Sequence, residues 1–222
     1  LEDQGKLEEA ETLYRRVLEG RERILGVHHH ETLTSVNNLR ILLHNQGKLE
    51  EAETLFRRVL EGRERVLGVD HPITLTSIKI LGDLLEHQGK LEEAETLYRR
   101  ALEGEERVLG VDHLDTLTSV NNLGLLLHNQ GKLEEAETLY RRALEGREHI
   151  LGVDHLDTLT SVNNLGVLLH NQGKLEEAET LYRRALEAKE RVLGVEHPKT
   201  LIVSRNLKLL ESKAKHCNCT IS

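Results

Sequence analysis

The chain has 222 residues, enough for a sizeable core, but it holds one Phe, four Tyr and no Trp or Met, so Leu, Val and Ala must fill that core. Its formal net charge is −8, and acidic and basic residues alternate along the sequence rather than cluster. This charge pattern is typical of solvated, salt-bridged helix faces and argues against nucleic acid as a partner.

The sequence carries no sign of a membrane-spanning segment or a secretory leader. No stretch approaches the roughly 18 consecutive apolar residues that a transmembrane helix needs. The only cysteines, Cys217 and Cys219, lie near the end of the chain, so no disulfide framework is expected. We therefore expect a soluble, cytoplasmic protein.

A repeat dominates the sequence. The segment QGKLEEAETL recurs every 42 residues without insertion or deletion, and its copies begin at Gln4, Gln46, Gln88, Gln130 and Gln172. A fixed period of this length predicts a solenoid of stacked units. Because the chain opens in the middle of a unit, we expect a partial first repeat and a fragment of a longer protein.

Each complete unit predicts two helices. The first, helix A, is expected at about 115–130 in one of these units. Its apolar residues recur at helical spacing and form a stripe: Leu117, Val120, Leu123 and Leu127. Gly131 ends this helix, and a longer helix B follows and continues to Gly152. The 42-residue period then predicts about ten helices in an all-α fold.

Helix starts and close contacts are also marked in each unit. Asp112 and Asp154, in the loops between units, are expected to cap the following helix A. Gly124 in helix A should let helix B approach closely, although the sequence offers no account of Arg40 at the same position of the first complete unit. Close contacts rather than hinges are likewise expected at Gly62, Gly104 and Gly146.

The last helix is expected at about 199–213. Here Ser204, Lys208 and Glu211 replace the Val, Gly and Leu of the internal units, as suits a capping helix with no further helix packed on it. The repeats therefore form a single array over residues 1–212, and residues 214–222 are expected to be a disordered tail.

The run NLGLLLHNQGKLEEAETLYRRAL resembles the tetratricopeptide repeat, whose signature positions correspond to Leu123, Gly124, Leu127, Ala136, Tyr140 and Ala143. The added length and the LGVDH loop resemble the 42-residue variety found in kinesin light chains. The resemblance implies a right-handed α-solenoid of helix-turn-helix units, with A helices lining a concave groove that binds an extended peptide or protein partner.

Paired asparagines inside helix A are the candidate binding residues. By the resemblance, the first asparagine of each pair faces the groove, where its amide can both donate and accept hydrogen bonds with a peptide backbone. Residues three or four apart share that face. The expected groove set is Asn37, Ile41, His44, Lys79, Asp83, Asn121, Leu125, His128, Asn163, Val167, His170 and Arg205.

A structural role is the alternative for these asparagines, which would then be solvated or bonded to a neighbouring loop. We expect that role for Asn38, Asn122 and Asn164, which the helix places toward the packing seam. For Asn121 and Asn163 the groove hypothesis predicts that replacing both by Ala leaves thermal stability nearly unchanged and weakens binding at least tenfold.

Metal binding, a cofactor and catalysis are not expected. The loop histidines recur once per unit, so stacked copies should lie about 10 Å apart, too far to share one zinc ion. The GK pairs lack the remaining residues of a phosphate-binding loop. Every possible catalytic set is copied along the array, whereas a catalytic site is usually made once.

The tail offers one further motif. Cys219 is followed by Thr, Ile and Ser, which fits a farnesylation signal, and Cys217 is available for a second lipid. Membrane association is expected only if Cys219 is prenylated, and an unmodified tail remains the alternative.

The sequence thus predicts a non-enzymatic scaffold that binds a protein or peptide. Two alternatives stay open: the chain is the C-terminal sensor part of a larger nucleotide-binding signalling NTPase, or it is a self-associating structural module.

Overall fold

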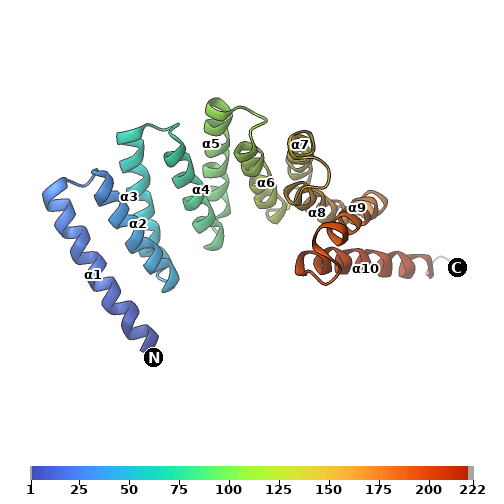
Figure 1. Ribbon diagram of the computed structural model, residues 1–222, viewed down its shortest axis with the longest axis horizontal. Coiled ribbons are helices and arrows are strands. Elements are labelled where there is room, and N and C mark those ends of the chain that lie inside the picture. Colours follow the sequence, from blue (N-terminus) through green and yellow to red (C-terminus); the bar gives the residue numbers. More distant parts are fainter. Residues whose placement is uncertain (1, 220–222) are drawn as a thin grey trace. The chain divides into compact units, whose positions relative to one another are not determined.

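The computed structural model describes the backbone of residues 2–219 and the side chains of residues 6–210 and 212. This part of the chain forms ten helices and no strands, as expected for an all-α repeat array (Figure 1). The helices are α1 (Glu2–Leu25), α2 (His30–Asn45), α3 (Leu49–Leu67), α4 (Pro72–His87), α5 (Leu91–Leu109), α6 (Leu114–Asn129), α7 (Leu133–Leu151), α8 (Leu156–Asn171), α9 (Leu175–Leu193) and α10 (Pro198–Cys219).

Two compact units make up the chain, residues 1–110 and residues 111–222. In the first unit each of α1 to α4 packs against the next helix along the chain, and in the second unit each of α6 to α9 does the same. The even-numbered helices correspond to the predicted helix A and the odd-numbered ones to the longer helix B. Within a unit each repeat therefore contacts its sequence neighbours, as in other solenoids.

The predicted apolar stripe of helix A is the core. On α6, the side chains of Leu117, Val120, Leu123 and Leu127 are all buried. Alanines and a tyrosine of the B helices cover this stripe, because Ala136, Tyr140 and Ala143 of α7 are also buried. Leu and small residues thus fill a core in which aromatic residues are scarce.

Glycine ends both types of helix. Every described residue with positive φ is a glycine, including Gly131 after α6 and Gly152 after α7. At the end of α6 the amide of Gly131 donates to the carbonyl oxygen of His128, and that of Lys132 donates to Leu127. A side chain with a Cβ would be strained in this left-handed conformation, so glycine fixes where each helix stops.

The residue that caps helix A is a histidine, not the predicted aspartate. Nδ1 of His113 accepts a hydrogen bond of 3.2 Å from the amide of Asp115, and Nδ1 of His155 accepts one of the same length from Asp157. Asp112 and Asp154 lie one residue too early in the chain. Asp154 instead pairs with Arg191 at 2.7 Å and so links the loop to α9.

Glycine in helix A makes room for the ring of helix B. A Cβ added at Gly124 would lie 3.0 Å from the Tyr140 ring, tighter than an ordinary contact. In the first complete hairpin both partners differ: the guanidinium of Arg40 lies over the Phe56 ring, 3.6 Å from its centroid. In the neighbouring hairpins the ring at this position packs against a glycine. Arg40, in place of that glycine, fits because its guanidinium stacks on the ring.

The close contacts expected at the glycines of helix B are confirmed. A Cβ added at Gly146 would lie 2.6 Å from a methyl carbon of Leu117, and one at Gly104 would overlap a methyl carbon of Leu75. These glycines are sites of helix contact rather than hinges.

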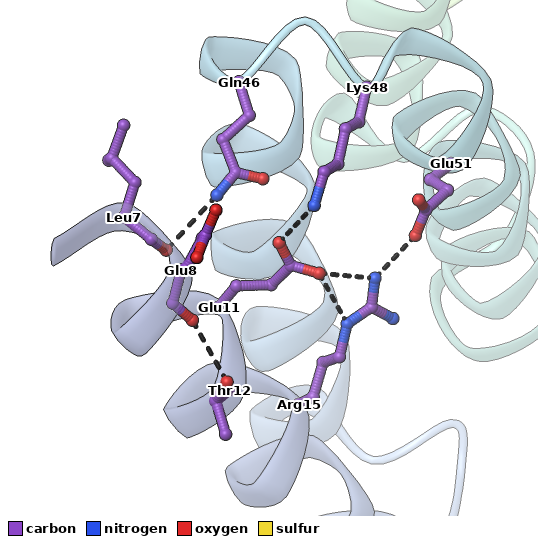
Figure 2. A network of polar contacts seen from close by, with 8 residues as sticks. All are labelled: Leu7, Glu8, Glu11, Thr12, Arg15, Gln46, Lys48 and Glu51. Carbon is purple, nitrogen blue, oxygen red and sulfur yellow. Dashed lines mark hydrogen bonds and ion pairs between the residues drawn. The ribbon is translucent and has the colours of Figure 1, made fainter. Parts of the chain in front are cut away.

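Ion pairs join successive B helices on the surface, and Figure 2 shows the first such network. Glu11 of α1 accepts from Arg15 at 2.9 Å and from Lys48 at 2.6 Å, and Arg15 also reaches Glu51 of α3 at 2.5 Å. Gln46 adds a bond of 3.2 Å to the carbonyl oxygen of Leu7. The same arrangement recurs at Glu137, where Arg141 and Lys174 join α7 to α9.

The last helix begins at Pro198, as expected, but runs to Cys219 rather than to about residue 213. No Gly or Pro follows Pro198, so the sequence contains no residue that would stop the helix earlier. The side chains of Cys217 and Cys219 and residues 220–222 lie outside the described part, and with them the expected lipidation signal.

Candidate functional site

The predicted groove residues all lie on the even-numbered helices, but they differ in accessibility. Exposed positions are Ile41, His44, Asp83, Leu125 and Arg205. Half-buried positions are Asn37, Lys79, His128, Asn163, Val167 and His170. Asn121 is buried, with 7% of its surface exposed, whereas its neighbour Asn122 is exposed.

Asparagines in the second unit tie neighbouring A helices together. The side-chain amide of Asn164 on α8 donates to Oδ1 of Asn121 on α6 at 3.2 Å, and Asn206 on α10 donates to Asn163 on α8 at 3.4 Å. Asn164 thus has the structural role expected of it, whereas Asn38 and Asn122, expected at the same repeat position of the seam, are exposed. Asn121 was expected to be accessible in the groove, and this expectation needs correction. Its side chain is buried and its Oδ1 already accepts a hydrogen bond from Asn164.

A second bond joins α6 and α8. The Asn171 amide lies 2.7 Å from Nε2 of His128, and since an amide nitrogen only donates, the ring nitrogen accepts. Burial lowers the pKa of His128, which favours the neutral ring that this bond requires. Side-chain hydrogen bonds therefore join α6 and α8 both midway along the helices and near their C-terminal ends.

In the first unit several predicted groove residues also bond within the fold. Lys79 of α4 pairs with the buried Glu105 of α5 at 2.6 Å. The Tyr98 hydroxyl donates to Asp83, and burial together with this carboxylate raises the pKa of Tyr98 far above its usual range. Lys79 and Asp83 of α4 therefore both bond to side chains of α5 and help to hold the two helices together.

The seam between α2 and α4 is open. By the 42-residue period, Asn37 and Ile80 stand where the second unit has an asparagine pair, and Oδ1 of Asn37 instead accepts two bonds from Arg40, at 3.1 and 2.9 Å. A cavity of about 320 Å³ lies here. Its walls include three predicted groove residues, Ile41, His44 and Asp83, and the aliphatic side chains of Ile80 and Leu84.

Sequence reasoning missed Arg40, Phe56 and Ile80 as site residues. The signal was present, because each departs from the residue that is usual at its repeat position, which is Gly for Arg40, Tyr for Phe56 and Asn for Ile80. The sequence alone does not show that these three residues line the same cavity.

No three His, Cys, Asp or Glu side chains in the described part of the chain lie together as ligands for a metal ion. The recurrent loop histidines serve instead as helix caps, as at His71 and His197. None of the helices in this part has the length and hydropathy that a membrane-spanning segment requires.

Stacked helical hairpins of 42 residues, each packed on its sequence neighbours, define the class of α-solenoid repeat proteins. The tetratricopeptide repeat family matches residues 37–104, 78–149, 115–189 and 157–218, and a second description of the same repeat matches residues 1–31. The chain belongs to the tetratricopeptide repeat family.

Solved structures agree with this assignment. BtubC (BKLC) from P. vanneervenii superposes with a TM-score of 0.77 at 23% identity, covering 94% of this chain and 84% of that one. A putative kinesin light chain from Podosopora anserina with nearly identical TPR-like repeats, and a substituted variant of that protein, superpose with a TM-score of 0.75 at 22% and 23% identity, each covering 86% of this chain and 90% of the other. In fold the array is therefore of the kinesin-light-chain-like type. No curated protein matches the chain.

Proposed function

We propose that the chain is a scaffold whose A-helix faces bind an extended peptide segment of a partner protein. Tetratricopeptide repeats are generally protein-interaction modules and typically lack catalytic activity. The partner, the groove and the cytoplasmic location are part of the proposal.

An aliphatic repeat position, present on A helices of both units, supports this function best. One repeat position carries Ile41, Leu125, Val167 and Leu209 in four of its five copies. Ile41 is 42% exposed, Leu125 43% and Leu209 51%, although a surface helix would normally place a polar residue at such a position. Exposed apolar side chains flanked by hydrogen-bonding groups suit a peptide, which needs both kinds of contact.

The asparagines take a different place in this proposal. Because Asn121 and Asn163 already bond to the next A helix, replacing them would disturb the fold as well as any peptide. The exposed aliphatic residues are better probes, since substituting an exposed side chain usually changes stability little.

A peptide selection tests the function. Peptides chosen from a random displayed library against the immobilised chain are titrated against wild type and against the Ile41→Glu, Leu125→Glu double variant. We expect at least tenfold weaker binding by the variant, because a carboxylate would replace each apolar contact. Val153→Glu is the control, since Val153 is exposed to 55% but lies in a loop between helices. If the double variant binds as wild type does, or if only the control loses binding, the A-helix faces are not the binding surface.

A further inference from the structure

The α2–α4 seam has lost both of the bonds that close the α6–α8 seam. The pairs Asn121–Asn164 and His128–Asn171 of the second unit correspond, by the 42-residue period, to Asn37–Ile80 and His44–His87 in the first. Among the described side chains no hydrogen bond joins either of these latter pairs, and the cavity of about 320 Å³ lies between the two helices. Ile80 stands where the other copies have Asn and cannot form the side-chain hydrogen bond, which accounts for part of this opening.

Arg40 places a buried charge at this cavity. Its side chain lines the cavity, and the residue is only 9% exposed. Nε and Nη2 both donate to the single Oδ1 atom of Asn37, and the guanidinium lies on the Phe56 ring. These are neutral partners, so no described carboxylate balances the charge.

The surroundings of Arg40 raise the cost of that charge. Burial, and the nearby positive charge of Arg63, lower the pKa of Arg40 to about 10. Asp83 also lines the cavity, but its carboxylate accepts the Tyr98 hydroxyl and forms no ion pair with Arg40. A buried cation without a counter-ion is costly, and an anion that enters the cavity would relieve this cost.

The remaining walls narrow the chemistry of that anion. Ile41, Ile80 and Leu84 offer aliphatic surface, which suits a short hydrocarbon stem. Among the described residues none bonds Nη1 or the second hydrogen of Nη2. This end of a guanidinium matches the two oxygens of a carboxylate. A phosphate carries more charge and more acceptors than one guanidinium among aliphatic side chains can satisfy.

We propose that the α2–α4 cavity is a carboxylate subsite, in which Arg40 binds the acidic side chain of a partner peptide and the aliphatic walls contact its stem. This inference rests on the proposed function and names one chemical feature of its ligand. The subsite occurs once among the described hairpins, because Gly82, Gly124 and Gly166 stand where Arg40 does.

A pair of small probes tests the subsite without a peptide. The full chain is titrated with 4-methylpentanoate and, separately, with the uncharged 4-methylpentanamide, while NMR follows the Arg40 Nε–H and the methyl groups of Ile41 and Ile80. We expect saturable shifts at these groups with the acid and at least fivefold weaker binding of the amide. Equal binding of acid and amide, or no saturable shift with the acid, would overturn the proposal.

The array supplies its own control variants. Arg40→Gly with Phe56→Tyr gives this hairpin the residues of its neighbours, which fold with that pair, and should abolish the preference for the acid. Ile80→Asn gives Asn37 the partner that the second unit has and keeps Arg40. It should lower the affinity for the acid at least fivefold. Unchanged acid binding in either variant contradicts the subsite, and the two variants guard against a folding defect in one of them.

The two proposals fail separately. If a library peptide binds but the acid does not, the carboxylate subsite is wrong and the peptide surface stands. If the acid binds and no peptide does, the scaffold function is wrong, but the cavity still binds a carboxylate. If a bound peptide retains its affinity after each Glu and Asp is changed to Gln and Asn, the subsite is not used by that peptide, and its proposed role is refuted.

Discussion

Adjacent asparagines on one helix have different roles here. Asn121 is buried and accepts a hydrogen bond from Asn164, whereas Asn122 is exposed. A buried amide that loses its partner costs about 1–3 kcal/mol, while an exposed one costs little.

Asn121→Ala is therefore expected to lower the free energy of unfolding by about 1–2 kcal/mol, because it leaves the Asn164 amide without its acceptor. Asn122→Ala, one residue along, should change it by less than about 0.5 kcal/mol. Urea denaturation followed by circular dichroism measures both. Equal stability of the two variants would show that the Asn121–Asn164 bond contributes nothing.

Two helix-interior glycines should respond oppositely to alanine. At Gly124 a Cβ meets the Tyr140 ring at 3.0 Å, and crowding of this kind costs about 1–3 kcal/mol, more than the gain in helix propensity. At Gly20 no atom lies within 4 Å, so only the propensity gain of about 0.5–1 kcal/mol remains.

Thermal denaturation of Gly124→Ala and Gly20→Ala checks this difference. We expect a lower melting temperature for the first and a higher one for the second. If Gly124→Ala is the more stable variant, the helices can separate freely and the close contact is not needed.

At the scale of the helices, carboxylates at one repeat position hold successive B helices together. Burial opposes ionisation of Glu137, but bonds from Lys174 and Arg141 outweigh it and lower its pKa to about 2. This value is below that of the unfolded chain, so the stabilisation is fully present above about pH 4.5 and is lost as the pH falls toward 2.

Glu137→Gln should accordingly reduce the free energy of unfolding by about 1 kcal/mol at pH 7, since Lys174 and Arg141 are half exposed and screened by solvent. The difference from wild type should shrink progressively between pH 5 and pH 2. Glu179→Gln is the matched control, because Glu179 at the same repeat position bonds Arg183 alone among the described residues. A difference that does not vary with pH would refute the ion-pair account.

The helices could be predicted from the sequence because their signals are local and are repeated. Leu at helical spacing and Gly at the end of each helix are visible in the internal units, where the predicted bounds agree with the structure within a residue or two. The end of the last helix was not predicted, because no glycine marks it. The cap residue was misassigned because Asp112 and His113 are adjacent and both offer an acceptor. The role of Asn121 could not be predicted, since a helical pattern places it on the groove side without showing that Asn164 reaches across to it.

The candidate site depends on contacts between repeats, which the sequence does not reveal one residue at a time. Arg40, Phe56 and Ile80 are separated by up to 40 residues but line one cavity. Only the packing of α2 on α3 and of α3 on α4 brings them together.

At the scale of the molecule, each compact unit has a core of its own. Because repeats in a solenoid interact mainly with their neighbours, residues 1–110 should fold as a fragment. We expect a helical circular dichroism spectrum and a cooperative thermal transition. A fragment of residues 1–89 lacks α5 and the buried Tyr98, Ala101 and Leu102, so it should melt at a lower temperature. An unfolded 1–110 fragment would contradict the assignment of this unit.

The scaffold function is tested most directly by the affinity of a library-selected peptide for wild type, for the Ile41→Glu, Leu125→Glu double variant and for the Val153→Glu control, measured by titration calorimetry under the same conditions. The account predicts at least a tenfold loss for the double variant and none for the control. Equal affinity of all three proteins would contradict it.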